Sequence, residues 1–400
     1  MFNLEMAPAD PILGLTDSFR KDPDPDKINL GVGVYKDDAG VTPIMRSVKK
    51  VEEQLLASES TKSYLGITGH AALPALTQPL ILGNDNPLIG RGVVVTAQAP
   101  GGTGALRVTG DFLKKANPDA TIWISTPTWA NHTAIFQASG LKTAQYAYYD
   151  AVRQGLDHDA FLDGLKAIPA GDVVVLHGCC HNPSGVDPDA DTWADIGSIA
   201  RERGWLPLFD FAYQGFGDGL AEDRAGLCKV LESGVPAFIC SSYSKNFGLY
   251  NERIGAVTYV GDSADEAARV FSHIKTTIRA NYSSPPSHGG AIVAEILADS
   301  ALRSDWEDEL AQMRQRIFAM REGFANGLAA RGVKRDFSFI KHQKGMFSFA
   351  GITPEQVDAL RERHHVYAVR SGRINVAGIT PDNIDRLCDS LIDVLQDSPD

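Results

Sequence analysis

The sequence predicts an α/β fold built on a mostly parallel sheet, followed by an α+β tail. In the middle of the chain, short runs of β-branched and aromatic residues alternate with longer amphipathic stretches. Such alternation is typical of parallel strands joined by right-handed helical crossovers. After about residue 285 the pattern changes, first to a long helical period and then to short strand-like runs. A chain of 400 residues is long enough for about two domains.

The expected buried strands are short apolar runs with amphipathic stretches between most of them. They are GVVVTA (92–97), TIWIS (121–125), VVVLHG (173–178), WLPLFD (205–210), AFICSS (237–242) and IGAVTYV (254–260). A helix is expected after GGTG (101–104), because Leu106, Val108 and Leu113 keep helical spacing. Asn117 and Pro118 stop that helix. Ile196, Ile199 and Ala200 predict another helix.

The tail combines one long helical stretch with short elements. Residues 296–332 predict a nearly continuous helix, broken around Asp299 and Ser300, that could bridge two domains. Short strands are expected at FSFIKH (337–342), GMFSFAG (345–351), VYAVR (366–370) and RINVAG (373–378), and helices at 354–365 and 381–395. The first 45 residues have no strong period, and we expect them to pack on this tail or to reach a partner subunit.

Composition and charge argue against nucleic-acid and membrane partners. The formal charge of −12 and the pI near 5.3 argue against a nucleic-acid partner, which favours a basic face. Five sparse cysteines suit a reducing compartment. The N-terminus lacks the basic start of a secretory signal, and no apolar run approaches the roughly 20 residues that span a bilayer. We therefore expect a cytoplasmic protein with no membrane partner.

The glycine-rich stretch GGTG lies between a strand and a helix, where backbone N–H groups can bind an anion. It also fits a plain tight turn, so alone it is a weak signal. No lysine follows it, which excludes a P-loop. GVGVY (31–35) lacks a third glycine and a following helical pattern, so we reject a dinucleotide site there.

Two further motifs end predicted strands at the same edge of the sheet. Asp210 ends an apolar strand in LPLFDFAYQGF, and a carboxylate at that depth needs a cation or several donors. Tyr213 follows three residues later. HGCCHNPSG (177–185) lacks the spacing of a zinc site, so we expect no metal and take its adjacent cysteines as small buried residues. Its candidate functional residue is Asn182.

The stretch SSYSKNFGLYNER (241–253) carries the strongest signal. Ser242, Ser244 and Lys245 follow an apolar strand, on the same edge as Asp210. Desolvation and nearby cations lower the pKa of a lysine and make it nucleophilic. The serines and Arg253 suit a phosphate, and Asp210 suits a protonated ring nitrogen. A lysine amine, a phosphate cradle and an acid for a pyridinium are what pyridoxal phosphate requires from a protein.

Two other functions remain open on these residues. Ser242 and Lys245 fit the S-x-x-K pattern of serine acyl-transfer enzymes, although S-D-N, K-T-G and G-x-S-x-G motifs are absent. A non-catalytic binding protein on the same fold is the other, since a fold alone does not determine function. An absorption spectrum separates both from a pyridoxal phosphate enzyme, because a lysine-bound cofactor gives a pH-dependent visible band that borohydride removes.

The chain resembles class I pyridoxal phosphate-dependent aminotransferases, in the aspartate and aromatic amino acid branch. The resemblance covers nearly the whole chain. It includes DPILGL, INLGVGVYKD, GGTGALR, TPTWANH, HGCCHNPSG, FDFAYQGF, SSYSKNFGLYNERIGA, IRANYSSPP, GMFSF and SGRINVAGIT. It implies fold type I of the pyridoxal phosphate transferases, with a large doubly wound, mostly parallel domain (46–315). A smaller α+β domain comes from both chain ends (1–45 and 316–400), and members are usually homodimers that share active sites.

The resemblance also implies residue roles in cofactor binding. Lys245 resembles the lysine that forms the Schiff base and carries the proton. Asp210 resembles the partner of the pyridinium nitrogen, with His132 behind it. The positions that resemble phosphate contacts are Gly102, Thr103, Ser242, Ser244 and Arg253, with Tyr64 supplied by the neighbouring subunit.

Further positions resemble those around the ring and the substrate. Tyr213 and Asn182 resemble the donors to the phenolic oxygen of the cofactor, and Trp129 the aromatic stacked on its ring. Arg373 resembles the clamp for the substrate α-carboxylate, and Arg279 the arginine that crosses to the neighbouring site to bind a side-chain carboxylate. The expected substrate contacts are Gly33, Trp129, Asn182, Arg279 and Arg373. The implied reaction moves an amino group, by way of the cofactor, to 2-oxoglutarate.

Three departures from the family pattern stand out. Ser184 replaces the usual threonine, Arg370 replaces a small or apolar residue, and HAALPAL (70–76) differs from the usual sequence after Tyr64-Leu65-Gly66. We expect Arg370 to be a solvated charge, with a change to the rim of the pocket as the alternative. Arg279 favours aspartate and glutamate, but aromatic-preferring relatives keep the same arginine, so the preferred amino acid stays open.

Overall fold

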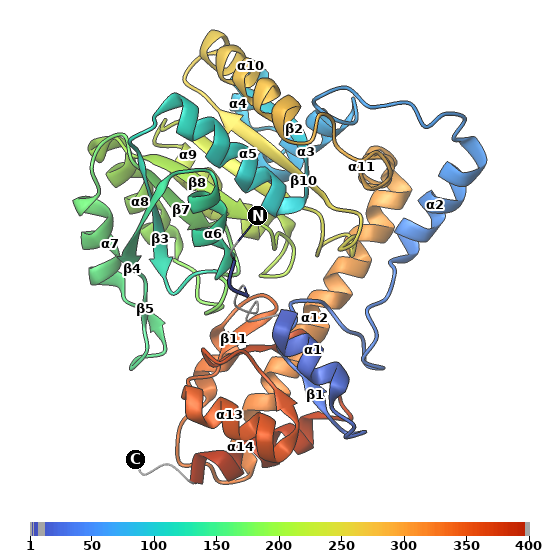
Figure 1. The fold of residues 1–400 in the computed structure, drawn as a ribbon, viewed down its shortest axis with the longest axis vertical. Helices are drawn as coiled ribbons and strands as arrows, with labels where there is room; N and C mark the ends of the chain where they lie inside the picture. Colours follow the sequence, from blue (N-terminus) through green and yellow to red (C-terminus); the bar gives the residue numbers. More distant parts are fainter. Residues whose placement is uncertain (1, 3, 7–12, 397–400) are drawn as a thin grey trace. The chain divides into compact units, whose positions relative to one another are not determined.

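A computed structural model describes residues 2, 4–6 and 13–396 of the chain. Residues 10–12 of the DPILGL motif and the other undescribed positions of the expected small domain lie outside the described residues. The chain divides into two compact units (Figure 1). The larger contains residues 43–182 and 186–314, and the smaller contains residues 1–42, 183–185 and 315–400. The short 183–185 segment was not separated in the division expected from the sequence.

The larger unit is organised around a seven-stranded sheet. In spatial order its strands are β2 (Val94–Pro100), β10 (Ile254–Val260), β9 (Ala237–Ser242), β8 (Leu206–Phe211), β7 (Val173–His177), β3 (Thr121–Thr126) and β4 (Lys142–Ala147). The pairs from β9 to β4 are parallel, whereas β10 is antiparallel to both of its neighbours. The six expected strands are all present, and β4 is an additional edge strand.

Helices cover both faces of this sheet (Figure 1). One layer contains α5 (Gly101–Ala116), α6 (Asn131–Ala138) and α10 (Ala264–Asn281). The other contains α3 (Leu73–Leu82), α7 (His158–Ala167), α8 (Ala190–Arg203) and α9 (Leu220–Leu231). The remaining elements of this unit are α2 (Arg46–Ser58), α4 (Pro87–Gly90), α11 (His288–Ala298) and the short β5 (Tyr149–Asp150) and β6 (Gly155–Leu156).

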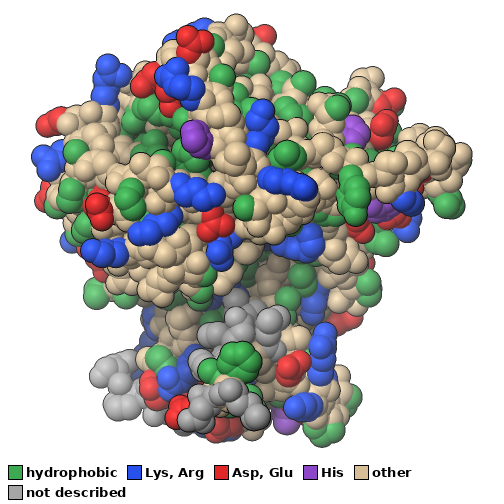
Figure 2. All heavy atoms as spheres, turned by 45° about the horizontal axis from the view of Figure 1, so that its top comes forward, with side chains coloured by type: hydrophobic (Ala, Val, Ile, Leu, Met, Phe, Trp, Pro, Cys, Tyr) green, Lys and Arg blue, Asp and Glu red, His purple; other side chains and the backbone are tan. Residues whose placement is uncertain are grey.

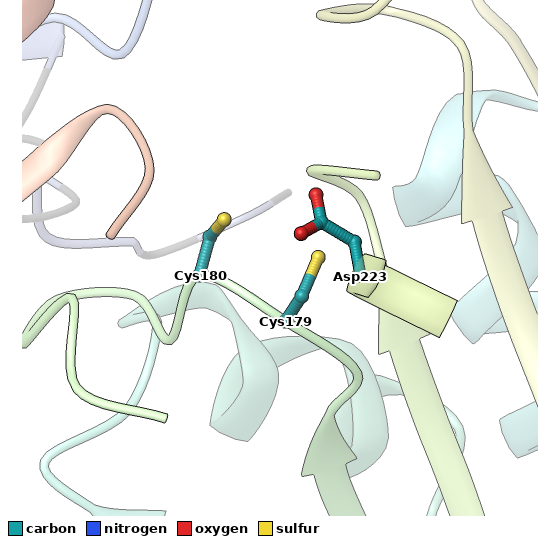
Figure 3. A group of neighbouring side chains, drawn as sticks. All are labelled: Cys179, Cys180 and Asp223. Atoms are coloured by element: carbon teal, nitrogen blue, oxygen red, sulfur yellow. The ribbon is translucent and has the colours of Figure 1, made fainter. Parts of the chain in front are cut away.

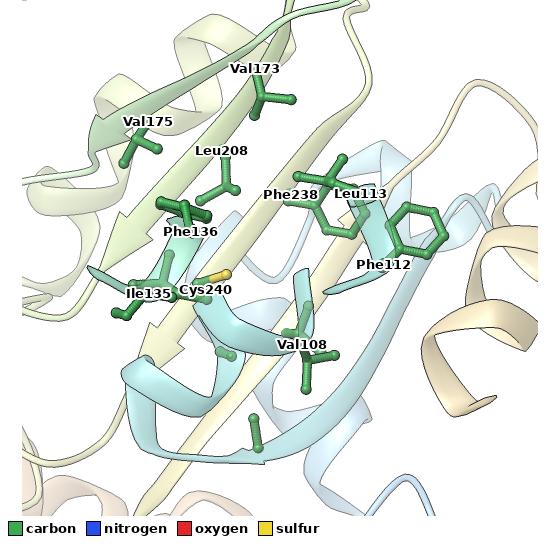
Figure 4. Close-up of a cluster of buried hydrophobic side chains, with 14 of the residues drawn as sticks. Val108, Phe112, Leu113, Ile135, Phe136, Val173, Val175, Leu208, Phe238 and Cys240 are labelled. Atoms are coloured by element: carbon green, nitrogen blue, oxygen red, sulfur yellow. The ribbon is translucent and has the colours of Figure 1, made fainter. Parts of the chain in front are cut away.

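The first layer of helices packs on the sheet through a continuous apolar core (Figure 4). Val108 and Phe112 of α5 and Phe136 of α6 meet side chains of the central strands such as Leu208 and Phe238. Burial of each such side chain contributes roughly 1.5–3 kcal/mol, so this core fixes α5 and α6 on the sheet. The ends of the central strands and the start of α5 are therefore held in place together.

The smaller unit combines both ends of the chain. It contains α1 (Leu13–Lys21), α13 (Pro354–His364) and α14 (Ile384–Gln396), with β1 (Ile28–Asn29) paired to β12 (Val366–Tyr367) and β11 (Phe347–Phe349) paired to β13 (Arg373–Asn375). The N-terminal segment thus pairs with the tail, as expected. The expected strand at 337–342 is wrong, because Ser338–His342 is a 3₁₀ helix closed by turns to Phe337 and Ile340. A second 3₁₀ helix is Val376–Gly378.

Helix α12 (Ser300–Ala330) has residues in both units. It follows α11 after a break at Asp299, whose carboxylate accepts the backbone N–H groups of Ala301 and Leu302. Among the described residues, no helix is both long and apolar enough to cross a membrane. On the face shown in Figure 2, basic and acidic side chains are interspersed.

Candidate functional site

Three neighbouring strands end in polar side chains on the face that carries α5 and α6. Side chains two residues apart in a strand share a face. His177 of β7 therefore follows core residue Val175, and Asp210 of β8 follows Leu208. Ser242 of β9 follows Cys240 in the same way. His177 and Asp210 are direct partners in the β7–β8 register. The carboxyl ends of parallel strands are where open α/β sheets bind ligands.

Lys245 lies in a turn directly after β9, and its neighbours anchor that turn. The Tyr243 hydroxyl is 2.6 Å from the Thr77 hydroxyl. The indole N–H of Trp306 donates to the carbonyl oxygen of Asn246 at 2.7 Å. The Trp306 ring also stacks on Phe247, with 4.4 Å between ring centroids. Buried rings and hydrogen bonds hold the backbone on both sides of Lys245, so the lysine is presented from a rigid support.

The Lys245 amine has the surroundings of a nucleophile. Burial lowers the pKa of Lys245; the positive charge of Arg253 lowers it further, while the carboxylate of Asp210 opposes both. The net pKa lies below the usual value for lysine. Its Nζ atom lies 4.7 Å from the centre of the Tyr213 ring. A larger fraction of this amine is therefore neutral near pH 7 than of an exposed lysine.

Asp210 is a buried carboxylate that stays ionised. Burial raises the pKa of Asp210, but the hydrogen bond from His132 and the electrostatic attraction of nearby groups, Lys245 among them, outweigh this effect. The net pKa lies below the usual value. His132 Nε2 is 3.0 Å from Asp210 Oδ2, and the His132 side chain is fully buried. The site therefore holds a fixed negative charge at the end of β8.

A chain of hydrogen bonds runs back from Asp210 through His132, Thr128 and His177. The Asn182 backbone N–H donates to Nδ1 of His177 at 3.4 Å, so this neutral ring carries its proton on Nε2. The Nε2–H group of His177 donates to Thr128 Oγ1 at 3.2 Å. The Thr128 hydroxyl therefore donates its own proton to His132 Nδ1 at 2.8 Å. His132 then donates from Nε2 to Asp210.

The pKa of His177 agrees with this assignment. Burial, reinforced by His132, lowers the pKa of His177 to about 3 against the opposing charge of Asp210. The ring is therefore neutral at pH 7. Sequence reasoning did not single out Thr128, and it considered His177 only as a metal ligand. A usable signal was present, because His177 ends the apolar run VVVLH just as Asp210 ends LPLFD.

The start of α5 forms a cradle with Ser242 and Arg253. The helix begins at Gly101, so GGTG forms its first turn rather than preceding it. Gly101 has φ of +73°, and a Cβ atom there would lie 2.5 Å from the Arg253 guanidinium. A Cβ atom on Gly102 would lie 3.2 Å from Cβ of Ser242. Glycine is thus required for the close approach of Arg253 to the helix N-terminus.

The donors of this cradle fit a phosphate. The first N–H groups of a helix lack partners within the helix and attract anions. Arg253 adds a cation, and its Nη1 atom is 3.5 Å from the Ser244 hydroxyl. With a low-pKa lysine and a buried carboxylate in the same cluster, the residues present fit the cofactor that the sequence resemblance implies.

Trp129 and Asn182 are also part of this cluster. The Trp129 ring packs edge-on against His132, with 5.3 Å between ring centroids. Asn182 is buried and follows β7 by five residues, after a bend at 178–180. Both residues belong to the larger unit, like Lys245 and Asp210.

Cys179, Cys180 and Asp223 form a separate buried group beside the site (Figure 3). Their side-chain donor atoms lie within 4.8 Å of one another. The Asp223 carboxylate already accepts four backbone N–H groups, those of Gly215, Gly217, Asp218 and Gly219. Burial raises the pKa of the Cys179 thiol well above its usual value. Because the Asp223 oxygens are already satisfied and the Cys179 thiol stays protonated, this group supports the turn after Tyr213.

Two predicted site residues of the larger unit are exposed. Tyr64 is 96% exposed. Arg279 lies near the end of α10, and its guanidinium donates to the Ser283 hydroxyl. In the part of the chain that the structure describes, neither side chain shares a hydrogen bond with the Lys245 cluster.

The other two predicted residues belong to the smaller unit. Arg373 is buried, donates from Nη2 to the carbonyl oxygen of Gly31 at 2.7 Å, and lies 4.2 Å from the centre of the Phe347 ring. A Cβ atom on Gly33 would lie 2.6 Å from the same ring. Arg370 is a surface residue paired with Asp358 at 3.0 Å, as a solvated charge would be.

Comparisons with known proteins agree with this chemistry. The family model for aminotransferases of class I and II matches residues 25–391. The chain is 54% identical to an aspartate aminotransferase of Escherichia coli (strain K12) over 98% of this chain and 99% of that protein. It is 46% identical to an aromatic-amino-acid aminotransferase of Pseudomonas aeruginosa, over 98% of each chain.

A solved structure gives the same result. The crystal structure of an aromatic-amino-acid aminotransferase from Burkholderia pseudomallei, covalently bound to pyridoxal phosphate, superposes with a TM-score of 0.96. The two chains are 48% identical, and the alignment covers 98% of each. The family resemblance found in the sequence is therefore confirmed, and the chain belongs to the class I and II aminotransferase family.

Proposed function

We propose that this enzyme transfers the amino group of aspartate to 2-oxoglutarate with pyridoxal phosphate as its cofactor. The observation that carries the proposal is the convergence of Lys245, Asp210 and the Gly101–Arg253 cradle at one edge of the sheet. The extensive identity to an aspartate aminotransferase supports aspartate as the amino donor. Cytoplasmic location is part of this proposal, supported by a cytoplasmic aspartate aminotransferase of rice among the relatives.

Each group of the cluster has a distinct task. Pyridoxal phosphate, when bound, supplies an aldehyde carbon for the amine and a ring that accepts an electron pair. The Lys245 amine would hold that carbon until the substrate amine replaces it there, and the freed Lys245 amine would then take the proton from the substrate Cα atom. Asp210 keeps a proton on the ring nitrogen, because its fixed negative charge favours the protonated form.

The neighbouring residues bind and orient. Gly102, Thr103, Ser242, Ser244 and Arg253 hold the phosphate through helix N–H groups, hydroxyls and a guanidinium. Tyr213 and Asn182 would donate to the phenolic oxygen of the cofactor, and Trp129 would provide the aromatic ring beside it. The His132–Thr128–His177 chain fixes the orientation of Asp210. Arg373 binds the α-carboxylate of the substrate, beside Gly33.

The active enzyme is proposed to be a homodimer with shared sites. The N-terminal residues Phe2, Leu4 and Met6 are between 82% and 96% exposed. Leu56, at the end of α2, and Tyr64 are similarly exposed. Contact with a partner subunit would bury these apolar side chains, which supports the proposal. Tyr64 contributes to the phosphate cradle of the partner, and Arg279 to its substrate side-chain pocket.

Preference for aromatic amino acids is the second candidate. It is favoured by the 46% identity to an aromatic-amino-acid aminotransferase and by the solved aromatic relatives. The S-x-x-K acyl-transfer alternative has no such support. Steady-state kcat/KM with aspartate, phenylalanine and tyrosine, each with 2-oxoglutarate, decides between the two preferences. We expect aspartate to have the highest value, and a higher value for phenylalanine would assign the chain to the aromatic branch.

A further inference from the structure

Gln98, in strand β2, is a fully buried polar residue outside the cluster described above. Its backbone N–H donates to the carbonyl oxygen of Thr68 at 2.9 Å, and its Oε1 atom accepts the backbone N–H of His70 at 2.9 Å. A Cβ atom on Gly69 would lie 2.3 Å from Cβ of Gln98. Gln98 therefore holds the 66–70 segment, which follows Tyr64, tightly against the sheet.

The same residue holds a second segment. Its Nε2 atom donates to the carbonyl oxygen of Pro286 at 2.7 Å, and its backbone carbonyl accepts the Tyr282 hydroxyl at 3.2 Å. Ser283, between these two contacts, accepts a hydrogen bond from the Arg279 guanidinium. Ser283 has φ of +67°, in the left-handed region. The position of the Ser283 hydroxyl thus depends on a backbone that Gln98 fixes on both sides.

We propose that Gln98 is a positioning residue that sets the selectivity of the enzyme for dicarboxylic substrates. It does so by holding the 282–286 segment, and through Ser283 the Arg279 guanidinium, in register with the 66–70 segment. The inference rests on the proposed role of Arg279 in binding the side-chain carboxylate. In this inference Gln98 contacts neither cofactor nor substrate, but it controls the orientation of Arg279, which contacts the substrate.

The chemistry of the side chain explains why glutamine is required. A glutamine amide offers an acceptor and a donor at opposite ends, which suits the His70 N–H and the Pro286 carbonyl together. A glutamate has the same shape but only acceptors when it is ionised. Gln98→Glu therefore keeps the contact to the 66–70 segment and places an oxygen against the Pro286 carbonyl. Gln98→Glu therefore disturbs mainly the 282–286 segment, which carries Ser283.

The experiment measures the ratio of kcat/KM for aspartate to that for phenylalanine in the full-length holoenzyme. We expect Gln98→Glu to lower this ratio about tenfold, the scale of one lost buried hydrogen bond. Tyr282→Phe removes only the contact to the Gln98 carbonyl and should lower the ratio about threefold. Gln78→Glu is the matched control, because Gln78 also bonds to β2, at Val94 and Thr96, away from both segments. It should change the ratio by less than about twofold.

The outcomes separate a positioning role from a structural one. Thermal unfolding of all variants reports any loss of stability, which by itself changes both substrates equally. Equal losses for aspartate and phenylalanine in Gln98→Glu would overturn the inference. If Gln98→Glu does not fold, an unchanged ratio in Tyr282→Phe overturns it instead. Arg279→Ala is measured in parallel, and an unchanged ratio in that variant refutes the proposed role of Arg279 and the inference with it.

Discussion

The Lys245 cluster and the Tyr64–Arg279 pair lie in the same unit but differ in what surrounds them. Lys245, Asp210 and His132 are enclosed by strand ends, α6 and the Trp306 support, and their hydrogen bonds stay within the unit. Tyr64 and Arg279 are exposed. In the proposed mechanism one chain supplies the groups for proton transfer, whereas the proposed selectivity for a second carboxylate needs another surface. The two regions should respond differently to substitution and to assembly.

The largest expected effect is at Lys245. Lys245→Ala removes both the covalent link and the proton carrier, and turnover should fall by about 10⁴-fold or more. Circular dichroism and equilibrium dialysis should show a folded protein that still binds pyridoxal phosphate through the phosphate cradle. Lys275→Ala, on α10, is the control and should retain activity. Near-wild-type turnover in Lys245→Ala would show that the cluster does not perform the chemistry.

The second largest effect is expected at Asp210. Asp210→Ala removes the fixed charge that holds a proton on the ring nitrogen, and kcat should fall about 10²- to 10³-fold for aspartate and phenylalanine alike. This equality distinguishes the cluster from the exposed pair. A loss confined to one substrate would place Asp210 in substrate selection.

Arg279 should affect one substrate class only. Loss of one partner from a desolvated ion pair costs about 2–5 kcal/mol, or roughly 30-fold or more. Arg279→Ala should therefore lower kcat/KM for aspartate by at least that factor, with a much smaller change for phenylalanine. Equal losses for the two substrates would mean that Arg279 only shapes the site.

Mixing variants tests whether the exposed pair acts across subunits. A Lys245→Ala subunit paired with an Arg279→Ala subunit creates one site with both defects and one with neither. Random pairing at equal amounts should restore about one quarter of wild-type aspartate activity in a two-fold dimer. No recovery, with subunit exchange verified by mass spectrometry, would indicate that each chain builds its own site.

The smallest effect should come from the hydrogen-bonded residues behind Asp210, of which His132 is the first. The pKa of Asp210 is raised by burial and lowered by the His132 hydrogen bond and by electrostatic attraction to nearby groups such as Lys245, with a net value below the usual one. The carboxylate is therefore ionised at and above its usual pKa, and its function is lost only as pH falls through the lowered value. His132→Phe removes the compensating hydrogen bond, so the acid limb of kcat/KM against pH should move to higher pH. An unmoved limb would assign His132 a packing role.

Much of the architecture followed from apolar runs and their boundaries. The six predicted strands are flanked by clear breaks, and polar residues that end buried strands predicted the edge where the cluster forms. Strand β4 (KTAQYA) was missed because its residues are mostly polar or small, as an edge strand allows. The run FSFIKH predicts a strand where the structure has the 3₁₀ helix 338–342, because so short a run has too few positions to separate the two periods.

The supporting contacts were beyond sequence reasoning. Thr128 and His177 are 49 residues apart, and Trp306 is 60 residues from Asn246. No local pattern predicts that such residues meet, because their contact depends on how helices pack on the sheet. Gln98 is similar, since its role depends on two segments that approach β2 from 28 and 188 residues away.

Peptide mapping after borohydride reduction tests the central claim most directly. Reduction of the enzyme loaded with pyridoxal phosphate should fix the cofactor to the protein and abolish the pH-dependent visible absorption. Mass spectrometry of the digest should then find one phosphopyridoxyl group, on Lys245. An active enzyme whose label lies on another lysine, or that carries no label, would contradict the account.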